Sequence, residues 1–220
     1  MSVTRDLKRR LKRFEPCRPR PAKEPPAGPC WVLGIKHDGF RIIAQRDAAG
    51  LRLITRNGYD LTDRFTLAAA AFTSPPARSC VVDGEAIAVN DSGLSTFDLI
   101  HYRRQDHPVT LCAFDLLELD GMDLRRAPTE ERKRTLTKLL RRSHPGIALN
   151  EPYEGDGASV YKHACALGCE GIASQRLGAP YRPGRVDHSL KIKNPAAPAA
   201  KREAEEDWGR CASSASKTKS

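Results

Sequence analysis

The amino-acid sequence predicts an α+β domain of antiparallel strands packed with a few helices. Two observations support this class. Short apolar runs of strand length are bounded by turn residues. Other segments carry apolar residues at helical spacing. Neither a Walker loop nor a G-x-G-x-x-G motif is present, so the common phosphate-binding loops are absent from the sequence. Strands interleaved with helices in this way are typical of α+β domains.

The 220 residues are expected to form three regions. Residues 1–29 are a basic arm followed by a proline-rich linker, and residues 30–195 form the globular domain. Residues 196–220 are a charged tail that we expect to be disordered. Leucines and a phenylalanine recur at helical spacing within 4–15, so this segment either contacts DNA or is a solvated helix.

Strands are expected wherever a short apolar run lies between turn signals. These are residues 31–35, 40–44, 42–46, 51–55, 80–89, 111–117, 172–174 and 189–192. The segments 42–46 and 51–55 flank Asp-Ala-Ala-Gly at 47–50, which predicts a hairpin.

Three helices are expected within the globular domain. Thr62 is expected to cap a helix that ends near Phe72. A second helix begins at Thr129 and ends near residue 142, with leucines at 136, 139 and 140 on one side. The third covers about 158–167 and is closed by Gly168.

The net charge of +10 favours a polyanionic partner such as a nucleic acid, or else forms a solvated basic surface. Seven scattered cysteines are typical of reduced thiols in a cytoplasmic protein. Cys165 and Cys169 lack a second pair that would complete a zinc site. The sequence contains neither a stretch long enough for a membrane span nor the apolar run of a signal peptide, so no membrane partner is expected.

The most informative segment is Lys-His-Asp-Gly-Phe-Arg at residues 36–41, between two apolar strand-like runs. An amine next to a carboxylate and a guanidinium suits covalent nucleotidyl transfer, in which the amine attacks a phosphorus atom and cations stabilise the developing charge. Taken alone, a lysine and an aspartate in such a turn are more often a surface salt bridge. The segments around it decide between the two interpretations.

Three further motifs follow in order: Val-Val-Asp-Gly-Glu at 81–85, Ala-Phe-Asp-Leu-Leu at 113–117, and Glu-Gly-Ile-Ala-Ser at 170–174 with Leu-Lys-Ile-Lys at 190–193. Together with the first motif they resemble the adenylation domain of ATP-dependent DNA ligases, closest to the ligase module of bacterial non-homologous end joining. The resemblance covers residues 31–194 and implies an ATP-grasp-like nucleotidyltransferase fold of antiparallel sheets.

The resemblance also implies roles for individual residues. The catalytic residues would be Lys36 as nucleophile, Asp38, Arg41, Lys191 and Lys193. ATP would contact Ile35, Lys36, Arg41, Glu85, Phe114, Glu170, Lys191 and Lys193. Mg2+ or Mn2+ would be held by Glu85 and Glu170, and nucleic acid by Arg56, Arg176, Arg182 and Arg185. Gly84 and Gly171 would allow close backbone approach.

Each of these residues also has an ordinary structural interpretation. Phe114 either stacks on adenine or belongs to the core. Lys191 and Lys193 share one face of a strand and either enter a pocket or point to solvent. Glu170 can simply cap the start of a strand. The arginines in the Arg-Pro-Gly loop at 182–185 either bind phosphate or are merely exposed.

The sequence departs from the family pattern at four places. Gly34, Gln175 and Ser189 stand where the family often has a glutamate, a lysine and an aromatic residue. The residues after Lys193 cannot form the OB-fold domain that closes over ATP in these ligases. Self-adenylation is therefore expected to be slow, to need a partner in trans, or to be absent, whereas sealing of a pre-adenylated nick depends less on that domain.

Two functions remain open from the sequence. The first is a minimal ATP-dependent DNA ligase that acts on nicks or ends, assisted by an end-binding or repair protein that supplies the missing domain. Within this class an RNA ligase or a capping-type reaction is also compatible with the motifs. The second is a non-catalytic DNA-binding accessory protein. The set of intact motif residues favours the enzyme.

Overall fold

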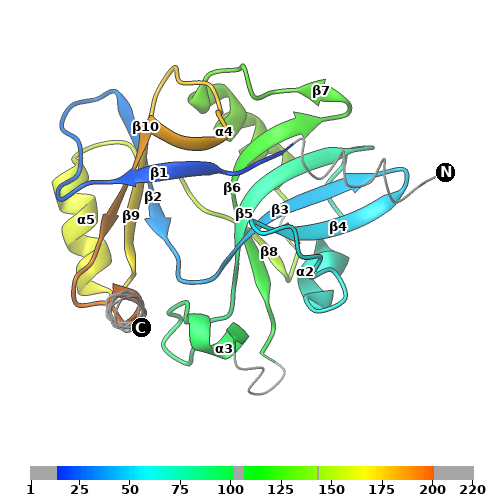
Figure 1. Cartoon of the computed structure of the whole chain (residues 1–220), viewed down its shortest axis with the longest axis horizontal. Coiled ribbons are helices and arrows are strands. Elements are labelled where there is room, and N and C mark those ends of the chain that lie inside the picture. The colour runs from blue at the N-terminus through cyan, green and yellow to red at the C-terminus, as the bar shows by residue number, and fades with distance from the viewer. Residues whose placement is uncertain (1–13, 102–106, 143, 201–220) are drawn as a thin grey trace, which may run out of the picture.

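The computed structural model describes residues 14–101, 107–142 and 144–200. The strands are β1 (Cys17–Pro21), β2 (Trp31–Lys36), β3 (Phe40–Asp47), β4 (Gly50–Thr55), β5 (Cys80–Ile87), β6 (Thr110–Leu119), β7 (Met122–Asp123), β8 (Ile147–Leu149), β9 (Gly171–Arg176) and β10 (Gly184–Lys193). The helices are α2 (Thr66–Ala71), α3 (Phe97–His101), α4 (Thr129–Leu139) and α5 (Gly157–Ala166). These elements confirm the predicted α+β class, with two sheets and few helices (Figure 1).

Sheet A is the four-stranded sheet, in the order β1-β10-β9-β2. Its apolar face packs against α5, where Leu33, Ile172 and Ile192 meet Ala164 in a buried cluster. Strands β2, β9 and β10 pair antiparallel, and β1 pairs parallel with β10. The face of sheet A opposite α5 is therefore left for polar side chains.

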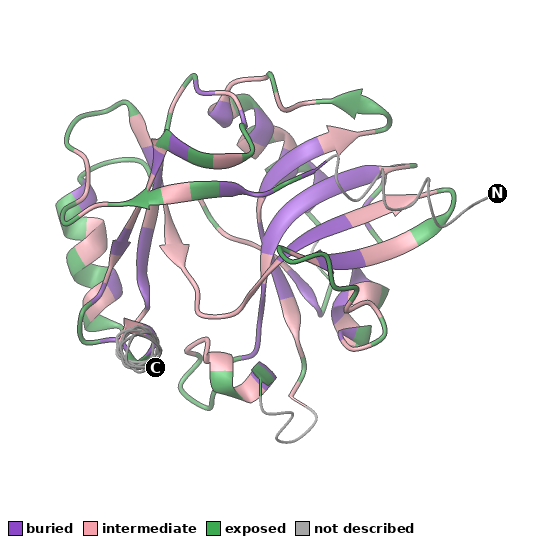
Figure 2. Ribbon diagram, viewed as in Figure 1, coloured by how far each residue is buried: buried purple, intermediate pink, exposed green. Residues whose placement is uncertain are grey.

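Sheet B is the six-stranded sheet, in the order β4-β3-β5-β6-β7, with β8 paired to β6. The hairpin predicted around residues 47–50 is confirmed, because β3 and β4 pair from Ile42 to Gly50. One face of the sheet forms the main core with α2 and α4, and the predicted leucines of α4 are buried there. Figure 2 shows buried residues concentrated along β3, β5 and β6.

The other face of sheet B is turned toward sheet A. Ile43, Val81 and Leu117 from sheet B are buried in one small cluster with Cys17 and Val186 from sheet A. The same face of sheet B carries Arg41, Asp83 and Glu85, because these residues alternate with the core residues along β3 and β5. The fold thus brings the polar faces of the two sheets toward each other.

Two expectations about local structure were wrong. Thr62 does not cap the first helix, which begins at Thr66; its hydroxyl instead accepts a hydrogen bond from the backbone N–H of Leu53 at 2.9 Å. Part of the expected linker, residues 17–21, forms strand β1. This strand tolerates its prolines because it lies at the edge of sheet A.

Other expectations concern residues beyond the described ranges. The basic arm up to residue 13 and the tail from residue 201 lie outside the described residues, so the predictions made for them remain predictions. At the described end of the chain, Ala197 and Ala199 are buried. In the part of the chain that the structure describes, no helix is both long and apolar enough to cross a membrane.

Candidate active site

Lys36 and Lys193 lie on either side of one glycine in sheet A. Each is the last residue of its strand, and each pairs with Gly171, the first residue of β9. Paired residues on neighbouring strands point to the same face of a sheet. The next pair along these strands, Ile172 and Ile192, points to the opposite face and packs against α5. The two lysines therefore share the face that is turned toward sheet B.

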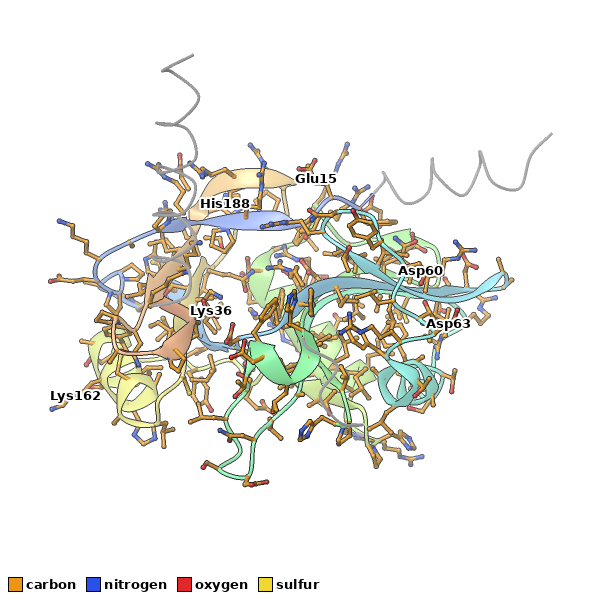
Figure 3. All side chains as sticks on the ribbon, turned by 60° about the horizontal axis from the view of Figure 1, so that its bottom comes forward. Glu15, Lys36, Asp60, Asp63, Lys162 and His188 are labelled. Carbon is orange, nitrogen blue, oxygen red and sulfur yellow. The ribbon has the colours of Figure 1, made fainter. Side chains whose placement is uncertain are left out.

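Glu170 lies between the two lysines. Its Oε2 accepts a 2.6 Å hydrogen bond from Lys36 Nζ, and its Oε1 is 3.6 Å from Lys193 Nζ. The carboxylate is 6% exposed, so it relies on these two cations to offset the loss of water around it. Figure 3 shows Lys36 in the middle of the molecule, whereas Lys162 of α5 points outward. Three predicted site residues thus form one cluster.

Gly171 is required for this arrangement. Its φ is +145°, and a Cβ atom there would lie 2.0 Å from the carbonyl oxygen of Ile192. At Gly84 a Cβ atom would lie 2.9 Å from the carbonyl oxygen of Cys112. The predicted close backbone approach is therefore present at both glycines, and the approaching backbone belongs to a neighbouring strand.

Arg41 lies on β3, on the face of sheet B that is turned toward sheet A. Its Nε and one Nη bind both oxygens of Asp83 at 2.5 and 2.6 Å, and the Tyr181 hydroxyl donates to the same carboxylate at 2.6 Å. Burial acts to lower the pKa of Arg41, but the charge and hydrogen bonds of Asp83 outweigh it and raise that pKa. The guanidinium lies 4.4 Å from the centre of the Phe114 ring. Arg41 is thus a fixed, permanently charged group beside an aromatic surface.

Glu85 joins the two halves of the site. It pairs in register with Arg41. Burial raises the pKa of Glu85 to about 7, while the charges of Lys36 and Arg41 act to lower it and the charge of Glu170 acts to raise it. These interactions place Glu85 near groups on both sheets. The site therefore contains five predicted residues that interact in a chain: Lys193, Glu170, Lys36, Glu85 and Arg41.

Phe114 is half-buried on β6, and a buried network that sequence reasoning missed holds the backbone around it. Lys133 Nζ donates a 3.0 Å hydrogen bond to the Phe114 carbonyl oxygen. The next residue, Asp115, accepts bonds of 2.8 and 3.0 Å from the Arg132 guanidinium. A signal for Arg132 existed, since it lies four residues before buried Leu136 on the apolar side of α4.

Asp38 lies near this cluster but binds a different partner. Its carboxylate accepts a 3.2 Å hydrogen bond from the backbone N–H of Phe97, and its own N–H donates to Ser95 Oγ at 3.1 Å. Asp38 therefore holds the segment that leads into α3. It also lines, together with Glu170, a shallow hollow. Its predicted catalytic role stays a prediction.

Lys191 and Ile35 occupy positions beside the cluster. Lys191 pairs with Ala173 and lies two residues from Lys193, about 7 Å along the same strand face. The Ile35 side chain packs in the apolar cluster behind sheet A, and its carbonyl oxygen accepts a 2.9 Å bond from Asn150. Any contact of Ile35 to a nucleotide would therefore use its backbone.

The four arginines predicted to bind nucleic acid are all exposed: Arg56, Arg176, Arg182 and Arg185. Arg176 pairs with Trp31, five residues along the sheet from the pair of Gly171 and Lys36, which is about 17 Å. Arg185 pairs with Arg18 of β1 near the same end of the sheet. These arginines do not join the lysine cluster, and their role remains a prediction.

The three departures within the motifs have visible consequences. Gln175 donates a 3.4 Å hydrogen bond to Asp115, so this position still contacts a carboxylate. Ser189 is buried opposite Gln175. Gly34 lies beside the Asn150 amide, since a Cβ atom there would be in van der Waals contact with that amide at 3.4 Å.

Comparisons with known proteins agree with this geometry. The family model described as "ATP dependent DNA ligase domain" matches residues 7–193. The multifunctional non-homologous end joining DNA repair protein LigD of Mycobacterium tuberculosis is 32% identical over 155 residues, which cover 70% of this chain and 20% of that protein. LigD of Pseudomonas aeruginosa is 30% identical over 175 residues, covering 78% of this chain and 21% of that protein. The chain spans about a fifth of the length of these curated relatives.

Solved structures of LigD ligase domains are also similar to this chain. The ligase domain of Mycobacterium tuberculosis LigD matches with a TM-score of 0.74 and 27% identity, over 83% of this chain and 61% of that chain. A mycobacterial DNA ligase D complexed with ATP and MES matches with a TM-score of 0.72 and 28% identity, over 82% and 60%. The structural similarity therefore covers about four fifths of this chain.

Proposed function

The chain belongs to the family of ATP-dependent DNA ligase domains, and on this premise we propose that it joins DNA strands through a covalent Lys36–AMP intermediate. The observation that carries the proposal is the cluster of Lys36, Glu170 and Lys193 at the end of sheet A, opposite Arg41 and Glu85. The cluster combines a nucleophile, a proton-accepting group and further cations in one place, as nucleotidyl transfer requires.

In the first step the neutral amine of Lys36 attacks the α-phosphorus of ATP. A P–N bond forms, the bond between the α-phosphorus and the bridging oxygen breaks, and pyrophosphate leaves with the electron pair. The amine must first lose a proton, and Glu170 Oε2, 2.6 Å from Lys36 Nζ, is the base placed to accept it. This proton transfer requires no movement of β2 or β9, because the two atoms are already within hydrogen-bond distance.

Charge develops on the phosphoryl oxygens during this transfer, and fixed cations stabilise it. Lys193 and Lys191 lie on the same face of sheet A as Lys36. Arg41 faces them from sheet B, held by Asp83. We assign adenine to the Phe114 ring and the ribose side to Glu85, because these groups lie on the Arg41 side of the site.

Two further transfers complete the reaction. The 5′-phosphate of DNA attacks the phosphorus of Lys36–AMP, which breaks the P–N bond and forms a DNA adenylate. The 3′-hydroxyl of the other strand then attacks the 5′-phosphate, the new phosphodiester bond forms, and AMP leaves. Both steps require the strand ends within near-attack distance, which binding to the duplex must provide.

A divalent cation fits the same site. Glu85 and Glu170 supply hard oxygen donors and lie close enough for the charge of one to raise the pKa of the other. Asp83 is occupied by Arg41 and Tyr181, so two carboxylates are left for Mg2+ or Mn2+, which usually keeps several waters and binds phosphates. Such an ion supplies charge neutralisation of the phosphates when it is bound.

We propose DNA nicks or ends as the substrate, because the relatives are end-joining repair proteins. Arg56, Arg176, Arg182 and Arg185 are assigned to its backbone, since exposed guanidinium groups bind phosphates. An end-binding or repair protein is the expected partner. The six free thiols in the described part of the chain support a reducing, cytoplasmic location.

Covalent labelling with α-labelled ATP and magnesium tests the proposal. Wild-type protein is expected to acquire label that pyrophosphate removes, Lys36→Ala is expected to acquire none, and the matched control Lys162→Ala, on the exposed side of α5, is expected to label normally. Labelled protein should then seal a nicked duplex. Protein that neither labels nor seals a pre-adenylated nick would contradict the proposal and favour a DNA-binding accessory role.

A further inference from the structure

Tyr161 of α5 contacts the end of strand β10 from behind sheet A. Its ring packs in the apolar cluster with Ile172 and Ile192, and its hydroxyl donates a 2.7 Å hydrogen bond to the carbonyl oxygen of Lys193. Lys193 is the last residue of the strand, so this carbonyl lies where the sheet ladder ends. The tyrosine supplies a hydrogen bond at that point.

Asn194 connects the same strand end to the backbone of Glu170. Its N–H donates a 2.8 Å bond to the Glu170 carbonyl oxygen, and its side-chain amide donates a 3.1 Å bond to the Cys169 carbonyl oxygen. Asn194 is 4% exposed, so water does not compete for these bonds. Tyr161 and Asn194 thus fix the backbone on both sides of the pair of Lys193 and Glu170.

The position of this backbone decides where the Lys193 ammonium can reach. A lysine side chain is a flexible stem that carries a point charge, so its own geometry fixes little. The Lys193 Nζ is 3.6 Å from Glu170 Oε1, which is an ion pair but longer than a hydrogen bond. The backbone at the end of β10 therefore fixes the Cα position from which Lys193 makes this ion pair beside Lys36.

We propose that Tyr161 is a positioning residue for nucleotidyl transfer, which acts by holding the carbonyl of Lys193 and so the ammonium of Lys193 beside the Glu170–Lys36 pair. The proposal rests on the proposed function, in which Lys193 stabilises the charge on the transferred phosphate. It assigns a catalytic consequence to one hydroxyl on the far face of the sheet from the reaction. A shift of about 1 Å at such a group is sufficient to slow a reaction strongly.

The packing of the Tyr161 ring and the hydrogen bond of its hydroxyl can be separated. Tyr161→Phe keeps the ring in the apolar cluster and removes the bond to Lys193, together with the interaction of the hydroxyl with Cys165. Tyr153→Phe is the matched control, since Tyr153 is 45% exposed and its only hydrogen bonds in the described structure are made by its backbone, to Leu33. A purely structural tyrosine would change stability in Tyr161→Phe without a selective change in the transfer rate.

Single-turnover labelling of Lys36 from α-labelled ATP provides the test. Tyr161→Phe is expected to lower the maximal rate about tenfold while the ATP concentration for half-maximal rate changes less than about twofold. In a Lys193→Ala background the same substitution is expected to have almost no further effect, because Tyr161 acts through Lys193. Equal effects in both backgrounds, or an unchanged rate in Tyr161→Phe, would overturn the proposal.

A second readout does not depend on activity. Lysines labelled by reductive methylation with carbon-13 give separate NMR signals, and the Lys193 signal is assigned by its loss in Lys193→Arg. In Tyr161→Phe this signal is expected to move toward that of exposed Lys162, whereas Tyr153→Phe leaves it in place. An unmoved signal overturns the positioning role. Wild-type protein that acquires no AMP label from α-labelled ATP would instead contradict the proposed function. The NMR result would still decide whether Tyr161 positions Lys193.

Discussion

Glu170 and Asp115 are two buried carboxylates that lie in very different clusters. Glu170 is held by two lysines at 2.6 and 3.6 Å, whose side chains are 26% and 21% exposed. Asp115 is held by both arms of the Arg132 guanidinium at 2.8 and 3.0 Å, and that side chain is 2% exposed. The first cluster is open on one side, and the second is closed.

The difference follows from the chemistry of the cations. An arginine fork matches a carboxylate in a fixed geometry, and Arg132 also donates to the carbonyl oxygens of Ala127 and Ala179. Its donors are therefore committed within the protein. Lysine is a point charge on a flexible stem, so Lys36 and Lys193 can exchange their carboxylate partner for a phosphate. A closed pair stabilises the fold, whereas an open cluster is available for a reaction.

The largest effect is expected from breaking the closed pair. Arg132→Met leaves Asp115 buried without its cation and is expected to lower the free energy of unfolding by about 3 to 5 kcal/mol. Urea denaturation measures this change. The double variant Arg132→Met with Asp115→Leu is expected to recover much of the loss, because no charge is then left buried. A double variant as unstable as the single one would contradict the assignment of a closed, structural pair.

A substitution in the open cluster is expected to have the opposite profile. Glu170→Gln keeps the shape but removes the charge that accepts the proton of Lys36, so labelling is expected to slow about a hundredfold. The free energy of unfolding should change by less than about 1 kcal/mol, since Lys36 and Lys193 keep partial access to water. Quenched time courses of Lys36 labelling measure the rate, and urea denaturation of the same preparation measures the free energy of unfolding. Loss of stability with normal labelling would reverse the comparison.

The sequence predicted the open cluster better than the closed one. Short motifs and apolar runs are local signals: the motifs that resemble the ligase family pointed to Lys36, Glu170 and Lys193, and the apolar runs placed strands that end one residue before each lysine. A buried aspartate in an apolar strand needs a partner, but its arginine is 17 residues away on a helix, and no motif connects the two. Only tertiary packing decides such a choice.

Two local errors have a similar cause. Thr62 has the residue type of a helix cap, but its hydroxyl binds the backbone of Leu53 on strand β4 instead. The prolines at 19 and 21 indicated a linker, although an edge strand accepts them. The hydroxyl of Tyr161 and the amide of Asn194 left no sequence signal, because their partners are backbone carbonyl groups.

Glu85 sharpens the comparison, because its charge is the least well compensated in the open cluster. Its pKa in the folded protein is about 7, above the ordinary value of 4.5, because burial disfavours the ionised form. The folded state therefore binds this proton more tightly than the unfolded state, and stability is lost as the pH rises from about 4.5 through 7.

Glu85→Gln is accordingly expected to be more stable than wild type by about 1 to 3 kcal/mol at pH 8, with the difference vanishing below about pH 4.5. Urea denaturation at both pH values measures it. Exposed Glu151→Gln serves as the control and should match the wild type at both. A Glu85→Gln variant that gains stability equally at both pH values would show that the ionised carboxylate is not the cause.

The smallest effect is expected at the end of sheet A that lies away from the lysine cluster. Arg185 is exposed beside Arg18, so in water it contributes little to stability, and its value would come from a phosphate of DNA. Arg185→Gln is expected to weaken binding of a pre-adenylated nick by less than about tenfold and to reduce the slope of log affinity against log salt by about one. Exposed Arg134→Gln on α4 is the control, and labelling of Lys36 should be normal in both. An unchanged salt slope would remove Arg185 from the DNA-binding surface, whereas slower labelling would connect this end of the sheet to the lysine cluster.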